Sequence, residues 1–250
     1  MTQVIWTQSY AVNTIVVDAQ KRLGLVGLLG VLQDVAWAHA DHLGHGYEAT
    51  IDEGAIWILS RQKLVVADWP VWGDQLTVRT WVRPVRGPLV HRDYEILVGE
   101  RKVGECAASW LTLDVRTRRP VRPAVGGAQL QCRKDYALAL TPEKIALRED
   151  LAEAAQFRVR NSDLDMNGHV NNTRYAQWIL DSASPEAYRT RRVVGYAVNF
   201  LSEVQVGDAV AIDSAPLPAP SAAETALHFQ GRRLSDGAQA FAAVLDVAAR

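Results

Sequence analysis

The sequence predicts an α+β fold in which a long helix lies across the concave face of an antiparallel sheet, and it predicts this arrangement twice. Three observations support the prediction: a long apolar helical segment, a series of strand-like runs after it, and a second helix with its own strand series in the same order. Internal similarity of this kind indicates duplication of one helix-plus-sheet unit.

The first helix is expected between Leu23 and Asp41. There LGLVGLLGVLQDVAWAHAD is apolar on nearly every side at its start, which is typical of a buried helix. Gly24, Gly27 and Gly30 recur at three-residue spacing inside it and indicate the close approach of another backbone or of a ligand. Strand-like runs bounded by turn residues follow at 54–68, 73–85, 89–99 and 104–116.

The second half repeats this order. NNTRYAQWILDS at 171–182 predicts a helix, and strand-like runs follow at 193–212, 226–234 and 237–248. Gly73-Asp74 recurs as Gly207-Asp208, in each case after an apolar strand and before an alternating one.

Between the halves the periodicity lapses, so we expect a first domain at 1–119, a linker at 120–155 and a second domain at 156–250. PVRPAVGGAQLQ is rich in proline and glycine, as linkers are. TPEKIALREDLAEAA predicts a connecting helix capped by Thr141, with Pro142 at its first position.

Composition excludes several classes of protein. The 250 residues carry a formal net charge of -1, which argues against a general nucleic-acid binder held by phosphate contacts. Two cysteines form neither a disulfide framework nor a four-ligand zinc site, so a reducing compartment is expected. The start lacks a secretory pattern, and the most apolar run, Leu23–Leu32, is about half as long as a membrane span. We therefore expect a cytoplasmic protein, a monomer or a homodimer, that does not enter membranes.

The segment RNSDLDMNGHVNNTRY at 160–175 is the strongest candidate for a site. In an extended chain Asp165, Asn167 and His169 would share one face, while Leu164, Met166 and Val170 would point into the core. The polar trio ends where a helix begins, with Asn171 or Asn172 as its cap, and free N–H groups there stabilise negative charge on an oxygen. Acid, amide and imidazole in this position suit attack of water on a carbonyl.

Other interpretations remain open at this point. The segment also fits a polar turn that merely caps a helix, and Asp165 and His169 provide two metal ligands without a third. His39, His42 and His45 have a spacing compatible with metal binding, although imidazoles at a helix end usually satisfy carbonyl groups. No nucleophile elbow, phosphate loop or dinucleotide fingerprint is present, and Cys106 and Cys132 lack an activating context. We expect neither a metal nor a cofactor.

Three motifs resemble the acyl-acyl carrier protein (acyl-ACP) thioesterases of plastids and bacteria: WPVWGDQLTVRTWV at 69–82, WLTLDVRTRRPVR at 110–122 and DLDMNGHVNNTRYAQWIL at 163–180. The resemblance covers nearly the whole chain and implies a tandem double hot-dog fold, two antiparallel sheets each wrapped around a long helix. The family's D-x-N-x-H pattern falls on Asp165, Asn167 and His169, and its further acid falls on Glu203. Val204 stands where the family often has cysteine, which favours a water-based reaction.

The resemblance implies hydrolysis of fatty acyl-ACP thioesters by activated water. His169 and Glu203 would hold and deprotonate the water, and which of them takes the proton stays open. Asp165 would orient His169, while Asn167 and the helix-start amides would position the thioester carbonyl. The first half would supply the acyl pocket, for which the candidates are Trp37, Trp57 and Leu59.

The partner implied is an acidic carrier protein, so a local basic rim is expected. The first candidate cluster consists of Arg116, Arg118, Arg119 and Arg122, and a second of Arg189, Arg191 and Arg192. Three alternatives stay open: an acyl-CoA thioesterase, a hot-dog hydratase acting on enoyl thioesters, and a non-catalytic fatty-acyl binding module. The preferred acyl length cannot be derived from these residues.

Overall fold

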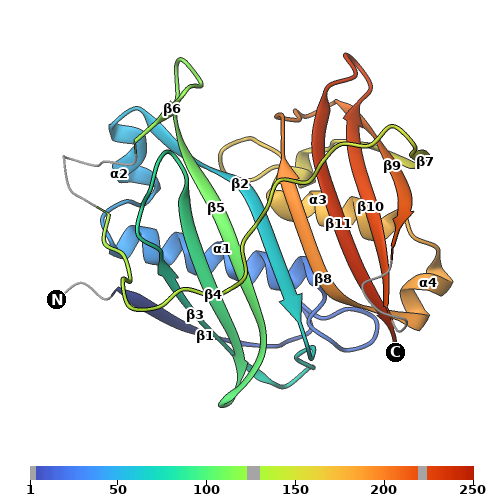
Figure 1. Cartoon of the computed structure of the whole chain (residues 1–250), viewed down its shortest axis with the longest axis horizontal. Helices are drawn as coiled ribbons and strands as arrows, with labels where there is room; N and C mark the ends of the chain where they lie inside the picture. Colours follow the sequence, from blue (N-terminus) through green and yellow to red (C-terminus); the bar gives the residue numbers. More distant parts are fainter. Residues whose placement is uncertain (1–3, 123–129, 219–223) are drawn as a thin grey trace. The chain divides into compact units, whose positions relative to one another are not determined.

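The computed structural model of the chain describes residues 4–122, 130–218 and 224–250. The chain divides into two compact units, Met1–Pro142 and Glu143–Arg250. Each unit combines an antiparallel sheet with a few helices, which confirms the predicted α+β class (Figure 1).

The first unit contains one long helix and a twisted antiparallel sheet. Its strands hydrogen-bond in the order β1-β3-β4-β5-β2, and β6 pairs with β5. In chain order the elements are β1 (Ile5–Ala11), α1 (Leu25–His42), α2 (Tyr47–Asp52), β2 (Ala55–Val66), β3 (Gln75–Val82), β4 (Val90–Val98), β5 (Arg101–Asp114) and β6 (Pro120–Val121).

The second unit repeats this plan, with strand order β7-β9-β10-β11-β8. The elements are β7 (Ala152–Arg158), a 3-10 turn (Asn161–Asp163), α3 (Asn172–Asp181), α4 (Pro185–Thr190), β8 (Arg191–Phe200), β9 (Ala209–Leu217), β10 (Glu224–Arg233) and β11 (Gln239–Ala249). In both units the strand preceding the helix stands at one end of the unit's strand order and the strand following the helix at the other, so the two units share one arrangement. The edge strands β1 and β7 were not predicted.

Helix α1 is buried along the side that carries Leu25, Leu28 and Leu32, as its apolar pattern predicts. A Cβ atom on Gly27 would lie 2.7 Å from the carbonyl oxygen of Val16, so the close backbone approach expected from the glycine spacing is confirmed at this position. A Cβ on Gly30 would meet nothing within 4 Å. Among the described residues, no helix combines the length and hydropathy needed to cross a bilayer.

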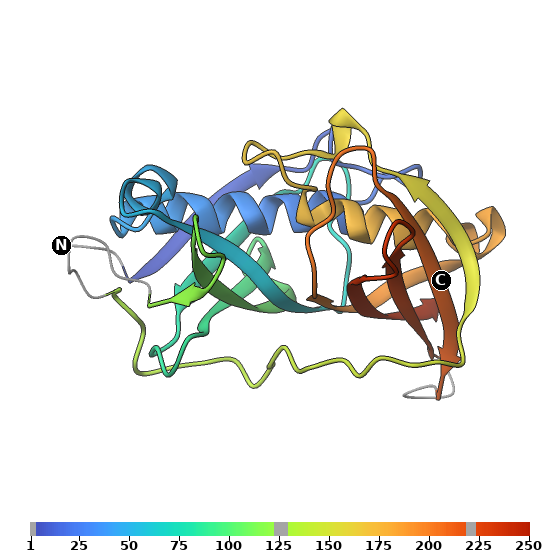
Figure 2. The same ribbon diagram turned by 90° about the horizontal axis from the view of Figure 1, so that it is seen from above.

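The predicted connecting helix after Thr141 is wrong. Residues 130–151 are extended, and the end of the predicted helix belongs to strand β7, which pairs with β9. Residues 123–129 of the predicted linker lie outside the described residues. In each unit the extended segment runs along the sheet face opposite the long helix (Figure 2).

Two buried amide side chains explain why the second-unit part of this segment is not helical. Asn199 of β8 accepts from the N–H of Ile145 at 2.7 Å and donates to the carbonyl of Glu143 at 3.0 Å. Gln230 of β10 accepts from the N–H of Arg148 at 2.6 Å and donates to its carbonyl at 3.3 Å. A helix would satisfy these main-chain groups internally, whereas here the sheet satisfies them from its face.

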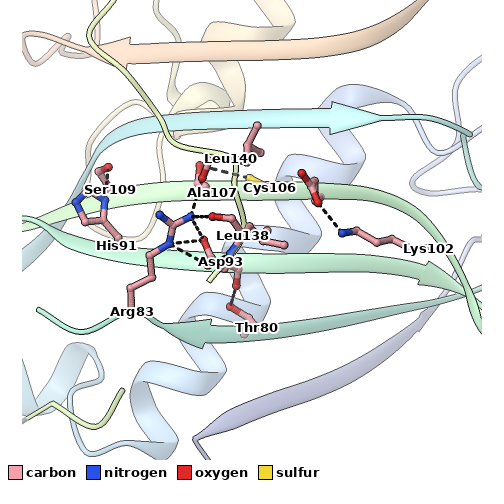
Figure 3. A network of polar contacts seen from close by, with 11 residues as sticks. Thr80, Arg83, His91, Asp93, Lys102, Cys106, Ala107, Ser109, Leu138 and Leu140 are labelled. Atoms are coloured by element: carbon pink, nitrogen blue, oxygen red, sulfur yellow. Dashed lines mark hydrogen bonds and ion pairs between the residues drawn. The ribbon is translucent and has the colours of Figure 1, made fainter. Parts of the chain in front are cut away.

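In the first unit an ion pair on the sheet hydrogen-bonds to the main chain of the extended segment. The Asp93 carboxylate, fully buried on β4, accepts from the N–H of Leu138 at 2.9 Å and from Arg83 Nε at 2.8 Å. Arg83 Nη2 donates to the carbonyl of Leu140 at 2.6 Å (Figure 3). The buried Asp93 charge is therefore paired and hydrogen-bonded, which burial requires.

We expect Asn199→Leu to lower the free energy of unfolding by about 1–3 kcal/mol, because it leaves the Ile145 N–H and the Glu143 carbonyl without partners. Urea unfolding checks the stability, and limited proteolysis between residues 143 and 150 checks whether the segment is released. The matched control is Asn161→Leu at an exposed position, which should change the stability by less than about 0.5 kcal/mol. An Asn199 variant as stable and as protease-resistant as the native protein would contradict this explanation.

Candidate active site

The loop from Leu164 to Val170 is a tight turn closed by an isolated antiparallel bridge between these two residues. The Asp165 N–H donates to the His169 carbonyl at 2.8 Å, and the Gly168 N–H donates to the Asp165 carbonyl at 3.0 Å. Gly168 has a φ of 75°, which favours glycine over residues with a Cβ. The predicted extended conformation of this stretch is therefore wrong.

The Asp165 side chain accounts for the turn. Its Oδ1 accepts from the N–H of Asn167 at 2.8 Å and from the N–H of His169 at 3.2 Å. An aspartate that collects main-chain N–H groups in this way forms an Asx turn. As a consequence Met166 does not point into the core and is 71% exposed, whereas Val170 is buried as predicted.

Helix α3 begins directly after the turn. Asn171 is its N-cap, and its side-chain oxygen accepts from the Thr173 N–H at 2.9 Å and from the Thr173 hydroxyl at 2.8 Å. This confirms the predicted cap and fixes it to Asn171. The turn therefore places His169 two residues before the cap of a ten-residue helix, near the end where the backbone dipole is positive.

His169 and Glu203 are the two predicted site residues whose side chains meet. His169 Nε2 lies 3.1 Å from Glu203 Oε1, and the side chains are 27% and 41% exposed. Glu203 reaches the histidine from the loop between β8 and β9. The pair is in hydrogen-bond contact and accessible to solvent, as a pair that activates water must be.

Asp165 and Asn167 take different positions in the site. Within the described part of the chain, the Asp165 carboxylate bonds to main-chain N–H groups and not to the imidazole, so it orients His169 through the turn. The Asn167 side-chain oxygen is buried and has no hydrogen-bond partner among the described residues. A buried amide end without a partner is available to a ligand.

Tyr175 on the first turn of α3 lies close to this group and is 5% exposed. Burial raises the pKa of its hydroxyl, and the charges of Glu203 and Asp165 raise it further. The phenol therefore stays protonated near the carboxylates. Its ring packs edge-on against Phe200 and Phe241, with centroids 5.1 and 5.4 Å apart.

The first unit contains the same turn with different residues. Asp18 Oδ1 accepts from the N–H groups of Gln20 and Arg22 at 2.8 and 3.1 Å, and Lys21 has a φ of 60° in the place of Gly168. The bridge Val17–Leu23 corresponds to Leu164–Val170. The aspartate is thus common to both units, whereas Asn167 and His169 correspond to Gln20 and Arg22.

The Glu203 loop is duplicated as well. The N–H groups of Ala67 and Asp68 donate to the Val103 carbonyl, and those of Leu201 and Ser202 donate to the Ala240 carbonyl. This register places Trp69 at the position of Glu203. Residue patterns alone did not single out Glu203, but aligning LSEVQVGD with ADWPVWGD marks it, because an acid there replaces a buried tryptophan.

The other candidates lie in different surroundings. His39 is buried, with Nδ1 2.7 Å from Arg92 Nη1, while His42 packs on Trp6, and burial lowers the pKa of His45. No three metal-ligating side chains gather among the described residues. Burial raises the pKa of the Cys106 thiol, which therefore does not act as a nucleophile.

The three predicted pocket residues have different environments. Leu59 is buried, and Trp57 donates from Nε1 to the His45 carbonyl at 2.9 Å while packing against a small core cluster. Trp37 is 36% exposed and stacks on Tyr47.

The first arginine cluster lies at the hairpin between β5 and β6 and directly after β6, and all four of its members are exposed. Asp114 shapes this hairpin by accepting from the N–H groups of Arg116 and Thr117 at 3.1 and 2.7 Å. In the second cluster Arg191 donates to the Thr225 hydroxyl at 2.8 Å.

Two family models match the chain. The acyl-ACP thioesterase N-terminal domain matches residues 3–124, and the acyl-ACP thioesterase C-terminal domain matches residues 147–244. The turn with His169 and the loop with Glu203 both fall inside the second match.

Curated relatives and solved structures give the same result. A dodecanoyl-[acyl-carrier-protein] hydrolase of Cinnamomum camphora is 27% identical over 80% of this chain and 56% of its own length. A palmitoyl-acyl carrier protein thioesterase of Gossypium hirsutum is 30% identical over 72% of this chain and 47% of its own length. The chain thus spans about half the length of these curated relatives.

The fold resembles that of an acyl-ACP thioesterase from Bacteroides thetaiotaomicron, with a TM-score of 0.85, 24% identity and 97% of each chain covered. The 12:0-ACP thioesterase of Umbellularia californica superposes with a TM-score of 0.82 at 16% identity, covering 100% of this chain and 96% of that one. From the two matches that together span most of its length, we conclude that the chain belongs to the acyl-ACP thioesterase family.

Proposed function

We propose that the protein hydrolyses fatty acyl-ACP thioesters to a free fatty acid and the carrier thiol, with water as the nucleophile. The observation that carries this proposal is the contact of 3.1 Å between Glu203 Oε1 and Nε2 of His169, which lies two residues before the N-cap of helix α3. Family membership supports the substrate class, because the relatives are named as acyl-ACP hydrolases and thioesterases.

In the proposed reaction, a water held by His169 and Glu203 attacks the thioester carbonyl carbon. The pair accepts the proton of the water, the C–S bond breaks as the tetrahedral intermediate collapses, and the leaving sulfur takes up a proton. Main-chain N–H groups at the start of α3 stabilise the negative charge that develops on the carbonyl oxygen, and the unpaired side-chain oxygen of Asn167 accepts a hydrogen bond from the water. Val204 and the buried Cys106 support water rather than a thiol as the nucleophile.

Asp165 acts in this scheme by building the turn that presents His169. The equivalent Asp18 turn in the first unit supports this role, since an aspartate is retained there without the histidine. We therefore assign Asn167, His169 and Glu203 to contact with the substrate or the water, and Asp165 to the conformation of the loop.

The two units correspond in this proposal to the halves of a tandem double hot-dog fold, with hot-dog domains near 1–119 and 156–250. The repeated strand order and the separate N- and C-terminal family matches support this division. We assign the acyl chain to the first half, with Trp37, Trp57 and Leu59 as its candidate contacts.

The carrier protein would dock on the exposed cluster of Arg116, Arg118, Arg119 and Arg122, since a carrier of opposite charge is attracted to it. The reaction would take place in the cytoplasm, whereas the plant relatives are named as chloroplastic.

We expect His169→Ala and Glu203→Gln each to lower kcat by at least about 100-fold, because each removes one member of the pair that activates water. The measurement is thiol release from acyl carrier protein followed with a thiol reagent. Loss of enoyl absorbance without thiol release would instead indicate a hydratase, and the absence of both reactions would indicate a binding module.

Asp165→Asn should lower kcat less than His169→Ala does, because the amide oxygen still accepts the two main-chain N–H groups. Asp18→Asn is the matched control: it makes the same change in the turn of the first unit and should leave kcat within about twofold of the native value. Thermal unfolding of both variants tests whether the two turns contribute similarly to stability. An Asp165→Asn variant as inactive as His169→Ala would show that the carboxylate charge itself takes part in the chemistry.

Steering by the arginine cluster predicts that kcat/KM for acyl carrier protein falls as the ionic strength rises from about 0.02 to about 0.3 M. The value for a neutral acyl-pantetheine should stay nearly constant over that range. Exchanging Arg116 and Arg119 for glutamate should lower kcat/KM for the carrier substrate alone. An equal loss with both substrates would rule out a docking role for this cluster.

A further inference from the structure

Glu203 lies in a loop and depends on its main chain for its position. The preceding residues, Leu201 and Ser202, donate from their N–H groups to the Ala240 carbonyl, and the following residue, Val204, is buried. The Glu203 side chain itself is 41% exposed and contacts His169. The loop therefore sets the point from which the side chain reaches His169.

Arg233, the last residue of β10, hydrogen-bonds to the main chain of this loop. Its Nη1 donates to the Glu203 carbonyl at 2.5 Å. Its Nε and Nη2 donate to the two carboxylate oxygens of Asp236 at 2.9 and 2.6 Å, and Asp236 Oδ1 also accepts from the Ala238 N–H at 3.1 Å. A planar guanidinium held at two points by a carboxylate has little freedom, so it fixes the carbonyl that it contacts.

In the first unit the same loop is contacted in a different way, by Arg101 of β5, which pairs with the Asp68 side chain. In the strand register, Val98 occupies the position of Arg233, because Val98 pairs with Arg101 as Arg233 bonds to Ala238. The hairpin there turns through residues 99–100, whereas the second unit uses residues 234–237. The longer hairpin, with an arginine at its start, therefore occurs in the unit that has Glu203, whereas the unit with Trp69 has Val98 at the position of that arginine.

We propose that Arg233, held by Asp236, is a positioning residue that fixes the Glu203 main chain and so keeps the Glu203 carboxylate against His169. This inference rests on the proposed function, because it requires Glu203 to take part in catalysis. The first unit forms the equivalent loop and hairpin with Val98 at the position of Arg233, and there Arg101 contacts the loop through the Asp68 side chain.

The contact between Arg233 and Asp236 does not titrate in the range where kinetics are measured. Hydrogen bonds from Arg233 lower the pKa of Asp236 to about 2. The carboxylate therefore remains charged above that pH and stays available to pair with Arg233 throughout a pH–rate profile.

The decisive variant is Arg233→Met, which keeps the aliphatic stem and removes the donors. We expect kcat to fall by about 10- to 100-fold, the usual cost of removing a group that orients a catalytic residue, while KM changes by less than about twofold. Arg233→Lys retains one donor for the Glu203 carbonyl and should recover part of the loss. The matched control is Arg232→Met, because the adjacent Arg232 pairs with Asp213 and Glu153 and should leave kcat unchanged.

A double variant separates positioning from general destabilisation. If Arg233 acts through Glu203, Arg233→Met in a Glu203→Gln background should lower kcat no further than Glu203→Gln alone. A second loss of the same size in that background would overturn the inference. Should Arg233→Met fail to fold, Asp236→Asn frees the arginine without removing it and is tested in the same way.

The His169 imidazole resonances provide a measurement that does not depend on turnover. Arg233→Met should shift them in the same direction as Glu203→Gln, and Arg232→Met should leave them in place. Normal kcat and unshifted resonances in Arg233→Met, together with an inactive Glu203→Gln, would refute the positioning role alone. A fully active Glu203→Gln would instead refute the proposed function of the pair.

Discussion

The candidate site depends on one side chain that satisfies two main-chain groups. The Asp165 carboxylate accepts the N–H groups of Asn167 and His169, and this interaction turns the chain back on itself just before helix α3. Without it, the short loop would have to satisfy these groups by other means, and the imidazole would lose its fixed direction. The cap at Asn171, the contact between His169 and Glu203 and the exposure of Met166 all follow from this turn.

The duplication separates scaffold from chemistry within one chain. Both units form the aspartate turn, and both form the loop that ends in Gly-Asp (67–74 and 201–208), with the same hydrogen bonds. These features therefore belong to the shared fold. The units differ where the chemistry is proposed, since Arg22 and Trp69 of the first unit correspond to His169 and Glu203 of the second. The Arg233–Asp236 contact is a further difference, and it lies beside one of the diverged positions.

Buried side chains that hydrogen-bond to the main chain also determine the path of the extended segment 130–151. Asp93, Asn199 and Gln230 are buried on the sheet faces, and each satisfies the backbone of the extended segment 130–151. Burial of these polar groups would be unfavourable if they were unpaired, so their partners are fixed. The same bonds oppose helix formation at Ile145 and Arg148, whatever the local propensity.

Much of this arrangement was determined by the sequence alone. The apolar periodicity of 23–41, the alternating strand runs, the Asn171 cap and the repeat of Gly-Asp were sufficient for the α+β class and the duplication, because each depends on neighbours within a few residues. The pattern of Asp165, Asn167 and His169 marked the site for the same reason. Tertiary structure decided what depends on distant partners: the extended path of 130–151 and the meeting of His169 with a glutamate 34 residues away. These two features rest on contacts between segments far apart in the chain, which no local pattern encodes, whereas the turn at 164–170 is closed by local bonds of Asp165 and was concealed by the strand-like alternation.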